Sequence, residues 1–226
     1  MTLGAAYGAL ASGVFVWALL VSRLRAKSWQ TKGVAGAIHE GGATDLSPNR
    51  IGLITFLGVI TSLFALFLTA YHMRMMDGMQ HGDWERFPVP RILWLNTFIL
   101  MLGSVAMQWA KSAAATGTDA QLRGRLVTGG ILTVAFLIGQ LMAWRELAAS
   151  GYFSPRNPAV AFFYLLTAVH GLHVLGGLAV SARTLIKMYV PAPKAVDVRQ
   201  IVALATIYWH YLLLVWLVLF GLLLST

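Results

Sequence analysis

The sequence predicts an all-α integral membrane protein with six transmembrane helices. Of its 226 residues, 58% are hydrophobic and 11% are charged, and the mean hydropathy is +0.71, which excludes an ordinary soluble domain. A helix needs about twenty apolar residues to cross a bilayer. Runs of that kind cover residues 3–22, 52–73, 92–110, 126–144, 158–182 and 201–224.

The basic residues predict how these helices are oriented. Of the 17 Lys and Arg residues, the larger share falls in segments on one side of the predicted spans, beginning with Arg23 and Arg25 and ending with Lys194 and Arg199. The positive-inside rule assigns that side to the cytoplasm, so both termini are expected on the outer side of the membrane. The net charge of +9 therefore indicates orientation and not nucleic-acid binding. Met1 to Leu3 carry no basic side chain, so we expect no cleaved signal peptide.

Two imidazoles interrupt the fifth apolar run, in the segment FFYLLTAVHGLHVLGGL at residues 162–178. His170, His173 and Gly177 are spaced i, i+3 and i+7, so they share one helix face. A polar side chain inside a bilayer needs a partner. We expect the imidazoles to face a neighbouring helix, and the glycine to let that helix come close.

The second run carries a stripe of small and weakly polar residues, which we interpret as a packing face. Its members are Thr55, Gly58, Ser62, Ala65, Thr69 and His72.

Catalytic chemistry has few candidates in this sequence. Cysteine is absent, which excludes disulfides and thiolate metal sites. All carboxylates fall in predicted loops or at helix ends: Glu40, Asp45, Asp77, Asp83, Glu85, Asp119, Glu146 and Asp197. A proton relay within this chain is therefore disfavoured, and no nucleotide-binding or zinc-protease motif occurs. Catalysis nearby would belong to another subunit.

The histidines have two possible roles. His170 or His173 could ligate a membrane heme together with His210, or all three could be structural groups held by hydrogen bonds, which we favour. The predicted outer loop at residues 72–81, HMRMMDGMQH, holds four methionines and two histidines. Those ligands suit copper(I), but a methionine-rich surface that meets a partner explains them as well.

Two motifs give the chain a resemblance to subunit III of the heme-copper oxidases. FFYLLTAVHGLHVLGGL resembles the family's helix with HGxHVxxG, and YWHYLLLVWLVLF at residues 208–220 is similar to its YWHFxDxxWxxLF. PVPRILWLNT and GLITFLGVITSLFALFLTAY add weaker support. The resemblance covers residues 52–224 in the family's order.

The resemblance implies a non-catalytic accessory subunit of a terminal oxidase in the aerobic respiratory chain. It implies no metal on this chain, heme and copper in subunits I and II, and phospholipid in a cleft between two helix lobes. It also divides the chain into an additional helix and cytoplasmic loop at 1–50 and a five-helix bundle at 51–226. The residues expected at structural, lipid or subunit contacts are His170, His173, Gly177, Trp209, His210, Trp216, Trp94 and Asn96.

Three departures from the family pattern mark a divergent member. Where the family usually has membrane acids, this chain has Ile60, Ala203 and Leu213. Alternatives to an oxidase subunit are a related component of a nitric oxide reductase system and a self-contained b-type heme protein. The sequence does not distinguish cytochrome c from quinol as electron donor.

Overall fold

The computed structural model describes residues 48–85, 87–152, 157–189 and 195–225. The first predicted helix, residues 3–22, lies outside them. The described helices are α2 (Pro48–His81), α3 (Ile92–Thr116), α4 (Asp119–Leu147), α5 (Pro158–Lys187) and α6 (Ala195–Ser225). All five are long and apolar enough to cross a membrane. The prediction of an all-α membrane protein is confirmed for this part of the chain.

Each helix extends beyond the apolar run that predicts it, and the largest correction concerns α2. Residues 72–81, which we expected to form an outer loop, are helical, and α2 ends only at His81. Met, Arg and Gln are good helix formers, so the helix continues after the hydropathy has fallen. Gly82, with φ of 74°, follows directly after the helix end.

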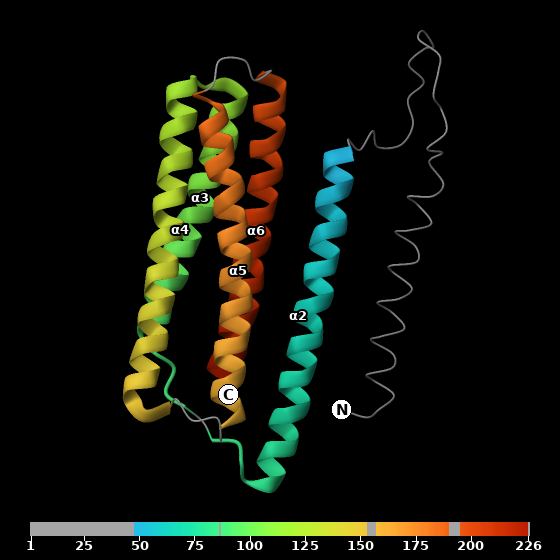
Figure 1. Ribbon diagram of the computed structural model, residues 1–226, viewed down its shortest axis with the longest axis vertical. Coiled ribbons are helices and arrows are strands. Elements are labelled where there is room, and N and C mark those ends of the chain that lie inside the picture. The colour runs from blue at the N-terminus through green and yellow to red at the C-terminus, as the bar shows by residue number, and fades with distance from the viewer. Residues whose placement is uncertain (1–47, 86, 153–156, 190–194, 226) are drawn as a thin grey trace, which may run out of the picture. The chain divides into compact units, whose positions relative to one another are not determined.

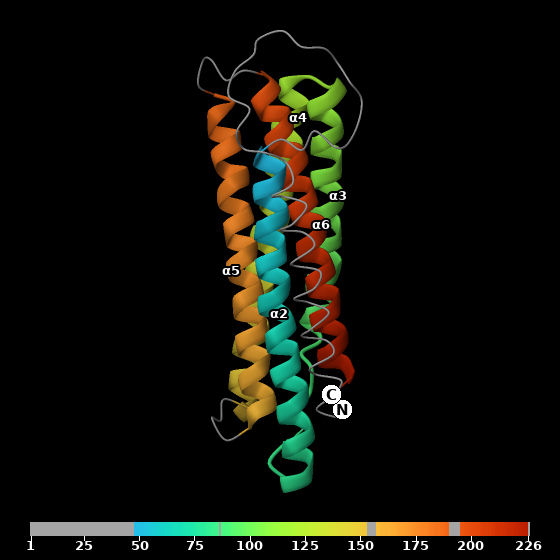
Figure 2. The same cartoon turned by 90° about the vertical axis from the view of Figure 1, so that its right-hand side faces the viewer.

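Helices α3 to α6 form an antiparallel bundle in which α3 contacts α4 and α6, and α5 contacts the same two helices (Figures 1 and 2). Helix α2 runs along α5 and α6 in both views. The C-terminus lies at the same end as the connection between α2 and α3 (Figure 1). Successive helices thus alternate in direction, as a chain that crosses a membrane repeatedly requires.

Helix α2 packs through its large side chains, and the expected packing stripe is wrong for the described contacts. Ile60, Phe64 and Tyr71 are buried, whereas most of the stripe, including Ser62 and Thr69, is exposed. The ring centre of Tyr71 lies 5.4 Å from that of Phe162 on α5. Small residues help only where two backbones approach closely, and here aromatic rings fill the space between the helices.

Short connections fix where the bundle helices begin. Only Gly117 and Thr118 separate α3 from α4, and the Thr118 hydroxyl caps α4 by accepting from the Gln121 amide at 3.3 Å. A short π-helical turn, η1 (Ala148–Tyr152), follows α4, and Gly151 adopts φ of 83° there. Asn157 caps α5, with Pro158 in the first helical turn.

Candidate functional site

His170 lies in the interior of the bundle. Its side chain is fully buried between Phe136 of α4 and Trp216 of α6, with ring centres 5.9 and 5.2 Å away. Neither ring nitrogen has a hydrogen-bond partner among the described residues. The expected hydrogen bond to a neighbouring helix is therefore wrong for His170, because aromatic rings occupy the positions where a polar partner would lie.

Trp216 and Asn96 bind α3 to the other helices of this interior. The Trp216 indole nitrogen donates to the Thr97 hydroxyl at 2.9 Å, and the Asn96 amide donates to the Phe136 carbonyl at 3.3 Å. A Cβ atom on Gly139 would overlap Asn96 Oδ1, so a larger residue there would displace the Asn96 side chain from the Phe136 carbonyl. Both predicted contact residues thus hold helices of this chain together.

The shared face of α5 meets three helices and not one. His170 faces α4 and α6, whereas the His173 ring lies 5.6 Å from that of Phe64 on α2. His173 Nδ1 lies 2.7 Å from the Val169 carbonyl in its own helix. The Tyr208 hydroxyl donates to the His173 carbonyl at 2.9 Å.

Gly177 lies at the contact between α5 and α6. A Cβ atom there would lie 2.9 Å from the Tyr208 ring and 3.3 Å from the Trp209 ring. Trp209 is buried, and its indole nitrogen has no hydrogen-bond partner among the described residues. The glycine therefore lets two aromatic side chains of α6 lie directly against α5.

The environment of His210 is polar and exposed, unlike that of His170. His210 lies on the exposed side of α6, where Nδ1 is 2.5 Å from Ser104 Oγ and Nε2 is 3.2 Å from Gln108 Oε1, both on α3. When the neutral ring carries its proton on Nε2, that N–H donates to Gln108 and the Ser104 hydroxyl donates to Nδ1. The Gln108 side-chain nitrogen then keeps both its donors for a further acceptor.

This polar cluster interrupts an apolar surface. Exposed neighbours at helical spacing are Met101 and Val105 on α3 and Leu214 and Leu217 on α6. We call these residues together with Ser104, Gln108 and His210 the α3/α6 face. Trp94, 60% exposed, lies nearer the start of α3 and contacts Phe220 edge-on, with ring centres 4.9 Å apart. The cluster lies near the middle of both candidate spans.

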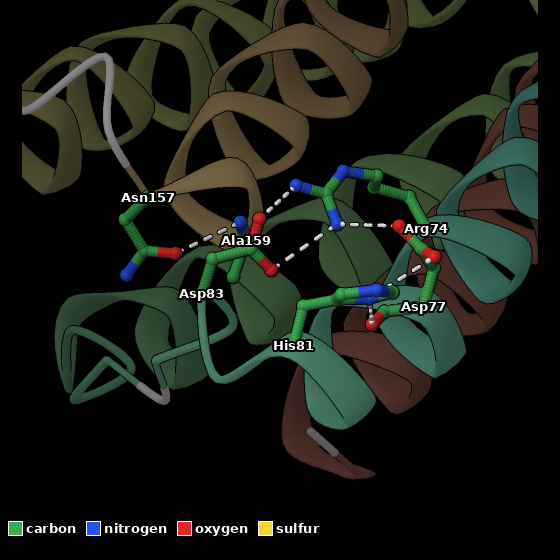
Figure 3. A network of polar contacts seen from close by, with 6 residues as sticks. All are labelled: Arg74, Asp77, His81, Asp83, Asn157 and Ala159. Atoms are coloured by element: carbon green, nitrogen blue, oxygen red, sulfur yellow. Dashed lines mark hydrogen bonds and ion pairs between the residues drawn. The ribbon is translucent and has the colours of Figure 1, made fainter.

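Polar contacts lie at the end of α2 and at the start of α5 (Figure 3), and the bond from Asn157 to the Glu85 carbonyl joins the connection after α2 to α5. The Arg74 guanidinium donates to an Asp77 carboxylate oxygen at 3.2 Å and to both carboxylate oxygens of Asp83. This guanidinium holds the pKa of Asp83 below its ordinary value, against the opposing effect of desolvation. The Asn157 side chain accepts from the Ala159 amide at 3.0 Å and donates to the Glu85 carbonyl at 2.9 Å. These bonds order the connection that follows α2.

The three histidines considered as heme ligands have different surroundings. No hydrogen bond or ring contact joins any two of His170, His173 and His210 in the described part of the chain. His170 is enclosed by rings, and both nitrogens of His210 are engaged. Within the same residues, no group of three or more His, Cys, Asp or Glu side chains could hold a metal ion.

Sequence reasoning missed the partners of the two central histidines. Ser104 and Gln108 are four residues apart on one face of α3, a spacing that marks a polar edge but not its partner. Phe136 carries no signal beyond hydrophobicity. Each of these contacts joins residues far apart in the sequence, so it depends on how the helices are aligned.

Comparisons with known proteins identify the family of this chain. The family model for cytochrome c oxidase subunit III matches residues 10–224. A probable cytochrome c oxidase subunit 3 of Mycobacterium tuberculosis is 30% identical over 183 residues, covering 76% of this chain and 86% of that protein. The cytochrome c oxidase subunit 3 of Thermostichus vulcanus is 29% identical, covering 76% and 85%. A cytochrome bo(3) ubiquinol oxidase subunit 3 of Pseudomonas aeruginosa is 25% identical, covering 80% and 85%.

Proposed function

Because the chain belongs to the cytochrome c oxidase subunit III family, we propose that it is the accessory third subunit of a heme-copper terminal oxidase in an aerobic respiratory chain. It stabilises the catalytic subunit and contributes no catalytic residue. Its partners are subunits I and II, which carry the heme and copper. It lies in a bacterial inner membrane with both termini on the outer side.

One observation carries the proposed role as a docking subunit: the hydrogen-bonded cluster on the exposed α3/α6 face. Lipid chains offer no hydrogen bonds, and ionisable residues within spans almost always face other protein or water. A second membrane helix that presents an acceptor would pair with the unused donors of Gln108. The apolar neighbours Met101, Val105, Leu214 and Leu217 supply the surrounding contact area.

The enclosed environment of His170 supports the assignment of redox chemistry to other subunits. A b-type heme requires axial ligands that face each other across the ring. The rings of Phe136 and Trp216 occupy the surroundings of His170, so this histidine serves as a packing group. The acid positions of the family remain apolar here, with Ile60 buried at 2% exposure. We therefore propose that proton uptake does not pass through this chain.

We also propose, from the family resemblance, that phospholipid binds between the helix lobes.

Relatives named for cytochrome c oxidase and for ubiquinol oxidase both match over about the same share of the chain. We therefore propose the subunit's place in the complex without assigning the electron donor.

The test is to solubilise membranes gently, isolate the tagged full-length chain and identify the proteins that accompany it. We expect a larger heme-bearing membrane subunit in stoichiometric amount, with a heme spectrum that follows that subunit. After the subunits are separated, the isolated chain should be colourless. A chain that purifies without such a partner, or that is itself red and reducible, contradicts the proposed function.

A further inference from the structure

An apolar groove lies between α4 and α5, on a different part of the bundle from the α3/α6 face. Its volume is about 360 Å³. Among the residues that line it are Leu126, Val127 and Gly130 of α4, and Leu178, Ser181 and Leu185 of α5. A Cβ atom at Gly130 would make an ordinary contact, 3.8 Å from Leu178, so a side chain can be introduced there without a clash at Cβ.

Arg123 stands at one end of this groove. It shares a face of α4 with Leu126, Val127 and Gly130, because these positions are spaced i, i+3, i+4 and i+7. Its guanidinium carbon lies 4.9 Å from the ring centre of Tyr189, which follows α5. The Nε atom is buried and has no hydrogen-bond partner among the described residues. A cation with an unused donor thus lies where the groove meets the predicted cytoplasmic membrane surface.

A buried polar atom beside the groove is also without a hydrogen-bond partner. Ser181 is 6% exposed, and its hydroxyl makes no hydrogen bond within the described part of the chain. An acyl chain alone would not pair with this hydroxyl, whereas the ester region of a lipid offers acceptors. The groove therefore combines an apolar wall, a buried donor and a cationic end.

We propose that this groove binds an anionic phospholipid, with an acyl chain along Gly130 and the phosphate on Arg123. The Arg guanidinium presents its donors as a planar fork that matches phosphate oxygens. Two other basic residues at this end are oriented differently. Arg125 donates to the Trp109 carbonyl at 2.6 Å on the opposite side of α4, and Arg183 lies away from the groove on α5 by helical spacing. This site does not depend on an oxidase partner and differs from the lipid cleft that the family resemblance implies.

The test places the full-length chain in nanodiscs with equal amounts of phosphatidylglycerol and phosphatidylcholine, and counts the retained lipids by native mass spectrometry. We expect the wild-type chain to retain phosphatidylglycerol preferentially. Arg123→Gln should lower that preference about five-fold, since one basic residue near a membrane surface contributes about that factor. Arg183→Gln removes the same charge at the same end but away from the groove, and should leave the preference unchanged.

A second variant tests the acyl part of the site. Gly130→Leu fills the groove and should reduce the retention of both lipids while the melting temperature stays near that of the wild type. An equal loss of preference in Arg123→Gln and Arg183→Gln overturns the site in favour of diffuse surface charge. If Gly130→Leu leaves lipid retention unchanged, the lipid does not bind in the groove. The same result is expected if a protein helix occupies the groove.

Discussion

His170 and His210 lie near the middle of adjacent helices, but their surroundings are inverted. His170 is fully buried and has no hydrogen-bond partner among the described residues, whereas His210 is exposed and has two. A protein that lay only in lipid would gain from the reverse arrangement, with polar groups inside and apolar groups outside. The difference is what we expect if the aromatic interior stabilises this chain and, as we propose, the α3/α6 face contacts another one.

Trp216→Ala should produce the largest effect, and it should appear in stability. The variant loses ring contacts with Phe136 and His170 and the bond to Thr97, so we expect the free energy of unfolding to fall by about 3–5 kcal/mol. Unfolding in mixed detergent micelles measures it. Trp94→Ala is the matched control, and should cost no more than about 1.5 kcal/mol, the range of an aromatic pair. Equal losses in both variants would contradict a distinction between interior and face.

His210→Leu should weaken partner retention and also cost the chain some stability, because it removes two hydrogen bonds between α6 and α3. Interhelical hydrogen bonds in membranes contribute about 0.6 kcal/mol each, so we expect the chain to lose about 1 kcal/mol of stability. Because Gln108 is then no longer held in place for a partner, partner binding should weaken roughly threefold. The partner retained in a dilution series of the purified complex measures this change. His173→Leu is the control, because His173 Nδ1 lies against the Val169 carbonyl of its own helix. If His173→Leu lost as much partner as His210→Leu, the α3/α6 face would not be the surface that binds the partner.

His170→Leu should stabilise the chain slightly. The substitution removes two buried nitrogens without partners while keeping an apolar side chain between the rings, and we expect a gain of about 1 kcal/mol. The same micelle unfolding experiment measures it, and partner retention should not change. A marked loss of stability would show that His170 has a polar partner in the native protein.

The smallest effect concerns the end of α2 and depends on pH. Because Arg74 depresses the folded-state pKa of Asp83, the ion pair stabilises the connection above the ordinary carboxyl pKa of about 3.9. That stabilisation is lost as the pH falls through the depressed value. Hydrogen exchange of the Asp83 and Trp84 amides, which both donate to the Gly78 carbonyl, should accelerate in acid relative to unstructured amides. Arg74→Gln should remove the difference; an unchanged acid response in that variant would exclude the ion pair as its cause.

The sequence was sufficient for the class of fold, five described helices and the family, because hydropathy and two local motifs carry that information. Helix ends were predicted wrongly where the hydropathy falls but the helix propensity stays high, as at residues 74–81 of α2. The environments of His170 and His210 could not be predicted from spacing. Ser104 and His210 are 106 residues apart, so their contact depends on how α3 and α6 are aligned by side-chain packing.

The most direct test of the account is to map which surface touches the catalytic subunit. The chain has no cysteine, so single cysteines can carry a photoreactive crosslinker without further changes. Leu214→Cys places it beside His210 on the α3/α6 face, and Leu172→Cys places it on α5, where the native side chain is 67% exposed. The account predicts a crosslink from position 214 to the heme-bearing subunit and none from position 172. A crosslink from 172 alone, or from 214 only to residues of the same chain, would contradict it.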